Sequence, residues 1–268
     1  MAGAGRELGF FIHRWILRRR YLLARAQPFD LELKVHADDV IGRHLYKYGS
    51  HDAEMTAFLQ RHIEIAPEDV IFDIGANIGW YSLVLDRIAP EGADIYAFEP
   101  EPENFGLLVE NVARNRASKV HPIRKGISDR EEVRKLHLCP SGNRGRHSLL
   151  PINEGEAIDV PVVPLDTFWA EQHLGARVLR LLKIDIEGYE YIAFKGAGAA
   201  LSRCRAVLAE YSPAYMKKAG LEPVRVLQLL RGCGFTPYLI RGEEKVAADM
   251  AELANAERRV DLFWEKTA

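Results

Sequence analysis

The chain has 268 residues, 48% of them hydrophobic, which is enough for one full hydrophobic core. Its formal net charge of −2 gives no support to a nucleic-acid-binding protein. The three cysteines lie far apart and fit neither a disulfide framework nor a zinc site.

The N-terminal segment mixes large apolar residues with arginines. Residues 6–25 contain six arginines and predict a basic helix. Such a helix suits adsorption to an anionic membrane face or to a partner, or it packs on its own domain with its arginines solvated. Because the charges interrupt the apolar stretch, we expect neither a signal peptide nor a membrane span, and we predict a cytoplasmic protein with peripheral membrane association left open.

The next stretch is predicted to be a lead-in to the main domain. Residues 28–52 look irregular, and their histidines and acids show no tight ligand spacing, so no metal site is predicted. We therefore divide the chain into an N-terminal basic helical segment with its lead-in, residues 1–52, and a main domain, residues 53–268.

Helices and strands alternate through the main domain. We expect helices at 53–65, 79–89, 101–115, 189–201 and 222–232. We expect strands at 70–74, 94–98, 119–124, 179–184, 205–211 and 235–240, and a final edge strand at 260–264. Strands separated by helices of this length predict parallel βαβ units and a doubly wound α/β sheet.

A long insertion, residues 126–178, separates the third and fourth predicted strands. Within it, 133–138 and 158–163 alternate like short strands. They flank a loop, 140–155, that is rich in Gly, Asn, Arg and Ser. Such a loop is suited to cover the mouth of an α/β site or to read a substrate.

The turn after the first strand of the main domain is the strongest functional signal. Asp73 ends an apolar strand, the small residues Gly75, Ala76 and Gly79 follow with Asn77 between them, and a helical pattern begins. Strand, glycine turn and helix in this order are typical of a nucleotide-type binding corner. The third glycine of the dinucleotide fingerprint is missing, so a ligand without phosphates fits better.

Two later strand ends add candidate ligand contacts. Glu99, followed by Pro100, ends the second strand, where an acid can accept hydrogen bonds from both hydroxyls of a ribose. Ser128 and Asp129 follow the third strand, where they could hydrogen-bond an adenine amino group or simply form a turn.

The fourth and fifth strands bring charged residues to the same edge of the sheet. Lys183, Asp185 and Glu187 alternate at the end of a central strand, and Glu210 ends the next. Charges in a central strand are costly unless they serve a site at its carboxyl end, where ligands bind in doubly wound sheets. A structural network of lysine and acids remains the alternative.

These motifs together resemble the FkbM family of S-adenosylmethionine-dependent methyltransferases. Asp73-Ile-Gly-Ala-Asn-Ile-Gly, Ala97-Phe-Glu-Pro, Gly126-Ile-Ser-Asp and Lys183-Ile-Asp-Ile-Glu-Gly-Tyr-Glu occur in that order, and the resemblance covers about residues 40–265. It implies a Rossmann-like class I methyltransferase with a mostly parallel seven-stranded sheet whose last strand is antiparallel. It also implies methyl transfer to a hydroxyl of a sugar, glycolipid or polyketide-type natural product.

The resemblance further implies residue roles. The Asp73–Gly79 loop lines the methionine portion of the cofactor, Glu99 takes the ribose hydroxyls, Ser128 and Asp129 lie near the adenine, and Asp185 lies near the reacting methyl.

An alcohol acceptor gains from a general base. Asp185 and Glu187 are the first candidates, followed by Glu210 and then His147 in the loop, while Lys183 could hold an acid ionised. Two rival functions stay open: N-methylation of another acceptor, and a non-catalytic binding module on a membrane or synthase partner.

Overall fold

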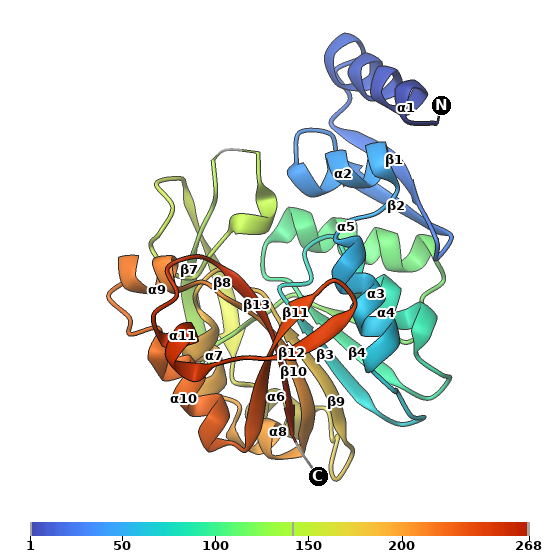
Figure 1. The fold of residues 1–268 in the computed structure, drawn as a ribbon. Coiled ribbons are helices and arrows are strands. Elements are labelled where there is room, and N and C mark those ends of the chain that lie inside the picture. Colours follow the sequence, from blue (N-terminus) through green and yellow to red (C-terminus); the bar gives the residue numbers. More distant parts are fainter. Residues whose placement is uncertain (1, 141, 267–268) are drawn as a thin grey trace.

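Eight strands form the central sheet of the computed structural model, which describes residues 2–140 and 142–266 (Figure 1). In spatial order they are β12 (Glu244–Ala247), β11 (Phe235–Arg241), β13 (Val260–Lys266), β10 (Cys204–Tyr211), β9 (Leu179–Ile184), β3 (Val70–Ile74), β4 (Asp94–Phe98) and β5 (Val120–Ile123). The five strands from β10 to β5 are parallel, which confirms the predicted doubly wound sheet.

The other end of the sheet differs from the prediction in two ways. The strand β13 lies between β10 and β11, antiparallel to both, so it is not the edge strand that we expected. Its run Leu262–Trp264 is buried throughout, as befits a strand covered on both faces. The edge is instead β12, an eighth strand beyond the seven expected, which pairs with β11 across a tight turn.

Helices cover both faces of the sheet. One face carries α3 (Ala53–His62), α4 (Trp80–Ile88) and α5 (Pro102–Arg114). The other carries α6 (Leu165–Glu171), α7 (Glu190–Lys195), α8 (Gly198–Arg203), α9 (Pro213–Lys218), α10 (Val224–Gly232) and α11 (Met250–Ala254). The single helix expected over 189–201 is two short ones, because the chain bends at Gly196, where a Cβ would meet the carbonyl oxygen of Ser128.

Alternate strand residues enter two separate hydrophobic cores. In β3 the side chain of Ile71 packs on the α4 side, whereas that of Phe72 packs on the α6 side. In β4 Ile95 and Tyr96 divide in the same way. This period of two, with apolar residues on both faces, is what a central parallel strand requires. The β3 and β4 ends that carry the site are therefore held from both sides.

The N-terminal segment is more ordered than we predicted. A helix, α1 (Ala2–Phe11), continues into a π-helical stretch, η1 (Ile12–Ile16), and is followed by a hairpin of β1 (Tyr21–Ala26) and β2 (Leu31–His36) and by α2 (Val40–Tyr48). The predicted helix over 6–25 thus ends at Ile16, and the predicted irregular stretch 28–52 holds a strand and a helix.

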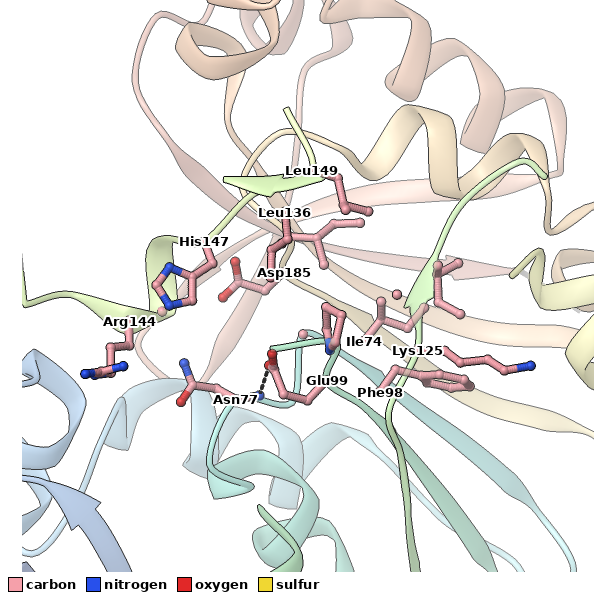
Figure 2. Close-up of a pocket in the computed structure, with 16 residues that line it drawn as sticks. Ile74, Asn77, Phe98, Glu99, Lys125, Leu136, Arg144, His147, Leu149 and Asp185 are labelled. Carbon is pink, nitrogen blue, oxygen red and sulfur yellow. Dashed lines mark hydrogen bonds between the residues drawn. The ribbon is translucent and has the colours of Figure 1, made fainter. Parts of the chain in front are cut away.

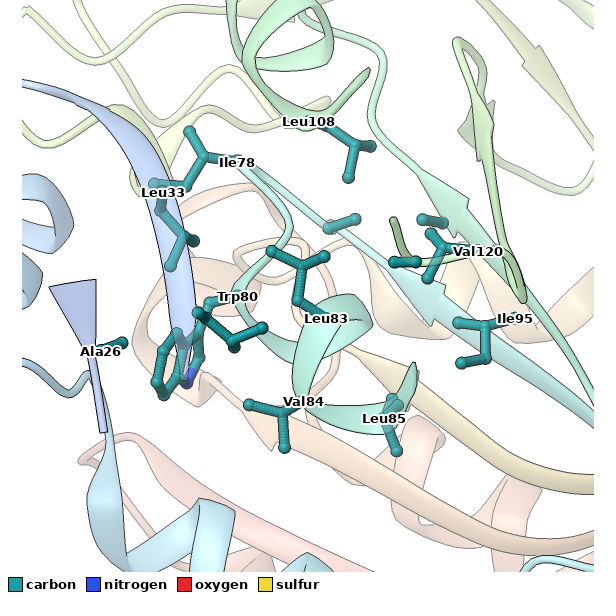
Figure 3. Packing of buried hydrophobic residues seen from close by; sticks show 14 of the residues in the cluster. Ala26, Leu33, Ile78, Trp80, Leu83, Val84, Leu85, Ile95, Leu108 and Val120 are labelled. Atoms are coloured by element: carbon teal, nitrogen blue, oxygen red, sulfur yellow. The ribbon is translucent and has the colours of Figure 1, made fainter. Parts of the chain in front are cut away.

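Burial explains both differences. In β1 and β2 every second side chain is buried, including Leu22, Leu33 and Val35, which is the pattern of a half-buried strand. Figure 3 shows Leu33 and Ala26 beside Trp80 of α4, so the hairpin joins the same core as the main sheet.

The insertion forms a small sheet of its own, as its alternating pattern predicted. Its strands are β6 (Gly126–Ile127), β8 (Ala157–Val163) and β7 (Glu132–His137), in that spatial order. The loop between β7 and β8 contains one turn of 3-10 helix, η2 (Arg144–Arg146). Among the described residues, no helix is long and apolar enough to cross a membrane.

Candidate functional site

Two pockets open side by side at the carboxyl ends of the parallel strands. We call one the corner pocket, which has about 530 Å³ of free space and is lined by Gly75, Asn77 and Glu99 among others. We call the other the acid pocket, which has about 1360 Å³ of free space, partly open to solvent, and contains Asp185, Glu187 and Glu210. The two pockets share only Asp185 and Gly145 among their lining residues.

A buried ion pair supports the wall between the pockets. Asp73, which is fully buried, accepts a hydrogen bond from Ser82 Oγ at 2.6 Å and lies 3.1 Å from Lys183 Nζ through its other oxygen. Lys183 also donates to the carbonyl oxygen of Gly75 at 3.1 Å. Burial by itself lowers the pKa of Lys183, but the carboxylates of Asp73 and Asp185 raise it above its ordinary value, so the lysine stays charged. Asp73 and Lys183 therefore join β3 to β9 and position the turn.

The glycines of the turn are required by close packing. Gly75 has a φ of 77°, and a Cβ there would meet the carbonyl oxygen of Asp185. Gly79 has a φ of 94°, and its Cβ would come within 2.8 Å of Leu108 Cδ1. Only glycine adopts such backbone angles without strain. Gly75 therefore lets the turn lie directly against the end of β9, and Gly79 lets it pack closely on α5.

Glu99 receives two backbone hydrogen bonds inside the corner pocket. Its Oε2 accepts from the N–H of Asn77 and its Oε1 from the N–H of Glu101, both at 2.9 Å; in Figure 2 a dashed line marks the bond to the backbone of Asn77, whose side chain points away from Glu99. Each carboxylate oxygen keeps a further lone pair for a ligand. Burial raises the pKa of Glu99 to about 7, against the lowering effect of the two N–H groups.

The remaining wall of the corner pocket is largely apolar. It contains the side chains of Phe98, Ile127, Leu136 and Leu149 and the ring of Pro100. The predicted contact Ala76 is buried and does not line this pocket; its N–H donates to the carbonyl oxygen of Phe98 at 2.9 Å. A flat heterocycle fits between such walls.

Ser128 and Asp129 make protein contacts instead of lining either pocket. The Ser128 hydroxyl pairs with that of Tyr189 at 2.9 Å, and Asp129 accepts from Lys195 Nζ at 2.6 Å. The preceding residues, Lys125 to Ile127, line the corner pocket. The segment after the third predicted strand thus reaches the corner pocket, as expected. The residues that line the pocket are Lys125 to Ile127, and not the predicted Ser128 and Asp129.

His147 lies in the corner pocket and is poorly suited to accept a proton. Its Nδ1 accepts a hydrogen bond from the N–H of Cys139 at 2.9 Å, so the proton of the neutral ring is on Nε2. Burial, followed by the charge of Arg144, lowers the pKa of His147 to about 4. Both observations weaken its predicted role as a base.

Three carboxylates meet in the acid pocket. Oxygen atoms of Asp185, Glu187 and Glu210 all lie within 4.8 Å of one another. Asp185 Oδ1 and Glu187 Oε2 are buried and have no hydrogen-bond partner among the described residues. The three oxygens form the group that could hold a hard cation such as Mg²⁺, which prefers carboxylate ligands.

The crowding of these acids changes their proton affinity. Burial, followed by the charge of Asp185, raises the pKa of Glu187 to about 7. Burial and the carboxylates of Asp185 and Glu187 raise the pKa of Glu210 to about 10, even though Arg259 Nη1 lies 2.8 Å from its Oε2. Near neutral pH Glu210 therefore holds a proton, and Glu187 is divided between its two forms.

Several residues of the acid pocket were missed by sequence reasoning. They come from α2, from the loop before α3, from α4 and from the start of β13: His44, His51, Tyr81, Arg259 and Asp261. The hydroxyl of Tyr81 donates to Asp52 at 2.6 Å, and its ring lies 5.1 Å from Lys183 Nζ. Asp261 could have been found from the sequence, because it is a charged residue within a predicted strand, the same feature that indicated Lys183.

The loop 140–155 reaches both pockets. Arg144, Gly145 and His147 line the corner pocket, and Asn143, Gly145 and Arg146 line the acid pocket. The loop is tied down where the N–H of Arg144 donates to Asp39 at 2.8 Å and its guanidinium to Glu103 at 3.1 Å. It therefore forms part of the wall in the conformation observed.

Comparisons with known proteins agree with this arrangement. A family model described as methyltransferase FkbM domain matches residues 73–237, which include the turn, Glu99 and the three acids. The chain is 31% identical over 210 residues to the 31-O-demethyl-FK506 methyltransferase FkbM of Streptomyces tacrolimicus, over 67% of this chain and 77% of that protein. It is 27% identical over 175 residues to the hexuronic acid methyltransferase AglP of Haloferax volcanii, over 62% of this chain and 63% of that protein.

A solved structure is similar over most of the chain. The methyltransferase FkbM from Methylobacillus flagellatus KT is 16% identical, with a TM-score of 0.43, over 98% of this chain and 60% of that one. The family assignment rests on the sequence matches.

Proposed function

The chain belongs to the FkbM family of S-adenosylmethionine-dependent methyltransferases, and from this premise we propose that it methylates a hydroxyl oxygen of a sugar, glycolipid or polyketide-type natural product. The corner pocket holds the methyl donor and the acid pocket holds the acceptor. The observation that carries this proposal is the place of Asp185, which lines both pockets. Methyl transfer requires the acceptor oxygen to lie close to the donor methyl group and in line with the bond that breaks. Asp185 lies where the two pockets meet, which is where these atoms would come together.

The residues of the corner pocket suit the donor. The pocket lies at the carboxyl ends of the parallel strands, where doubly wound sheets bind their ligands. Glu99 offers a lone pair from each oxygen to a ribose diol, and the apolar walls suit the adenine. The unpartnered Asp185 Oδ1 offers negative charge to a cationic sulfonium. When bound, S-adenosylmethionine supplies an activated methyl group.

The chain's own contribution to the reaction is alignment and removal of a proton. Asp185 is the proposed base, because its free oxygen lies where an acceptor hydroxyl would approach the donor. Glu187 and Glu210 are its partners in the acid cluster. With a pKa of about 7, Glu187 can share the proton that Asp185 receives.

The charges of the acid pocket favour a neutral, hydroxyl-bearing acceptor. Carboxylates outnumber cationic side chains there by five to three, and burial, followed by the charge of Asp185, raises the pKa values of Glu187, Glu210 and Asp261. An acceptor that brought a carboxylate or phosphate beside the acids would add to the repulsion. Carboxylates also accept hydrogen bonds from hydroxyl groups.

The proposal is tested by Asp185→Asn with a matched control. We expect this variant to lower kcat by a factor of about 10²–10⁴, the usual contribution of a positioned proton acceptor, while it still binds S-adenosylmethionine. The control is Asp261→Asn, which removes a carboxylate from the same pocket but away from the boundary, and whose kcat should fall less. The measurement is product formation with a panel of neutral polyols and sugars, beside calorimetric binding of the donor. Turnover by Asp185→Asn close to that of the unmodified protein would remove Asp185 from the reaction.

A further inference from the structure

The N-terminal helix presents a row of exposed apolar side chains. Phe11, Ile12, Trp15, Ile16 and Leu17 are all at least 36% exposed, and Trp15 and Ile16 reach 63%. Of the large hydrophobic residues exposed elsewhere in the described chain, none forms a comparable run. We call these five residues, with Arg14 and Arg18–Arg20, the N-terminal surface.

The helix that carries this surface is fixed to the domain by its other side. Phe10 is buried, and its ring lies 5.9 Å from that of Tyr46 of α2. Lys47 Nζ pairs with Glu7 at 2.6 Å. Figure 1 shows α1 beside α2 at the outer end of the N-terminal segment. The helix is therefore held against α2, while Phe11 and Trp15, at the edge of the groove between α1 and α2, stay exposed to solvent.

The charges of the surface have one sign. Residues 11–20 contain four arginines and no acid. Arg14 lies over the ring of Trp15, with 5.0 Å between its guanidinium carbon and the ring centroid. Arg18 and Arg19 are exposed, and Arg20, itself 65% exposed, pairs with Glu103 at 2.6 Å. Apolar side chains including Trp, interleaved with arginines, match the boundary between the headgroups and acyl chains of an anionic bilayer.

We propose that the N-terminal surface docks the protein on an anionic lipid bilayer, with Trp15 and Ile16 entering the interface and Arg18 and Arg19 facing lipid phosphates. The apolar row without the arginines would suit many protein partners. The excess of positive charge over residues 11–20 favours a membrane, because it complements an anionic headgroup layer. The proposal is independent of the proposed function, since docking requires neither donor nor acceptor.

The surface lies close to the acid pocket. Val40, the first residue of α2, lines both the acid pocket and the groove between α1 and α2. A docked bilayer would thus lie on the side of the molecule where α2 forms part of the pocket wall.

The experiment is cosedimentation of the full chain with vesicles. Vesicles of phosphatidylcholine alone are compared with vesicles that also contain phosphatidylglycerol. We expect binding to the anionic vesicles at least about tenfold tighter than to the neutral ones, and weaker with added salt. Two double variants, Trp15→Ala with Ile16→Ala and Arg18→Gln with Arg19→Gln, should each weaken binding by at least about tenfold.

Matched controls separate docking from general surface properties. Val133→Ala removes a side chain that is 66% exposed on β7, and Arg124→Gln with Arg231→Gln removes two exposed arginines elsewhere; both should bind as the unmodified protein does. Unchanged circular dichroism melting of all variants excludes unfolding. The proposal is overturned if anionic vesicles do not bind the protein, or if the Trp15–Ile16 variant binds them normally. It is also overturned if light scattering shows a dimer that this variant dissociates, because the surface would then join two copies of the chain.

Discussion

The corner pocket and the acid pocket share a wall but are built in different ways. The corner pocket is centred on the turn after β3 and the end of β4, with further walls from β6, β7 and the loop 140–155, and backbone N–H groups hold its carboxylate Glu99. The acid pocket collects charged side chains from α2, the loop before α3, the loop 140–155, β9, β10 and β13. Burial and the repulsion between neighbouring carboxylates raise the pKa values of its acids Glu187 and Glu210.

Under the proposed function, the corner pocket binds a donor that the whole family uses, and the acid pocket binds an acceptor that differs among relatives. A donor shared by a whole family can be bound by local backbone geometry, which a short motif encodes. An acceptor that varies among relatives is recognised by side chains from distant segments, any of which can change without disturbing the turn. The following changes probe the two pockets separately.

The largest expected effect is on donor binding. Glu99→Ala removes the carboxylate proposed to take both ribose hydroxyls, and two lost hydrogen bonds to a charged group, at about 1.5–3 kcal/mol each, raise the Kd by roughly 10²-fold or more. Calorimetry with S-adenosylmethionine measures this. Glu99→Gln keeps one accepting oxygen, so its Kd for S-adenosylmethionine should lie between that of the unmodified protein and that of Glu99→Ala. Unchanged affinity of the alanine variant would break the assignment of the corner pocket to the donor.

A smaller effect is expected in the acid pocket. Glu187→Gln should lower kcat by about tenfold, less than loss of the base itself, because Glu187 only shares the proton. With its pKa near 7, Glu187 carries a proton below that pH and is ionised above it, so kcat/KM of the unmodified protein should rise as pH increases through about 7.

The pH profile of kcat/KM in the Glu187→Gln variant tests whether Glu187 causes this pH dependence. In Glu187→Gln the limb near pH 7 should shift or disappear, whereas Glu64→Gln, at an exposed position after α3 that lines neither pocket, should leave it in place. An unaltered limb in Glu187→Gln would assign the pH dependence to another group.

The smallest expected effect is that of metal removal. Arg259 already lies 2.8 Å from Glu210, and protons held by Glu187 and Glu210 offset the remaining charge. We therefore expect treatment with EDTA to change kcat by less than about twofold. A loss that Mg²⁺ restores and an equal ionic strength of NaCl does not would make the three acids a metal site and replace the proposed base.

The sequence predicted the architecture of the corner pocket in some detail. The strand bounds 70–74 and 94–98, the two glycines and Glu99 follow from local pattern alone, because adjacent parallel strands bring their carboxyl ends to one edge of the sheet. The alternating stretches of the insertion were also recognised from a period of two. Sequence reasoning failed at 28–52, where the alternation of Leu31, Leu33 and Val35 is short and lies beside a turn.

The sequence by itself thus determined the parallel sheet, the turn after β3, and the presence of Lys183, Asp185 and Glu187 at a strand end. Only the tertiary structure decided that Arg259 pairs with Glu210 beside the acid cluster, that β13 lies inside the sheet, and that Nδ1 of His147 accepts a backbone hydrogen bond. The physical reason is the distance in sequence over which each property is determined. Turns and the alternation of strand residues depend on neighbours along the chain, whereas burial, ion pairing, strand order and pKa depend on contacts between residues far apart in sequence.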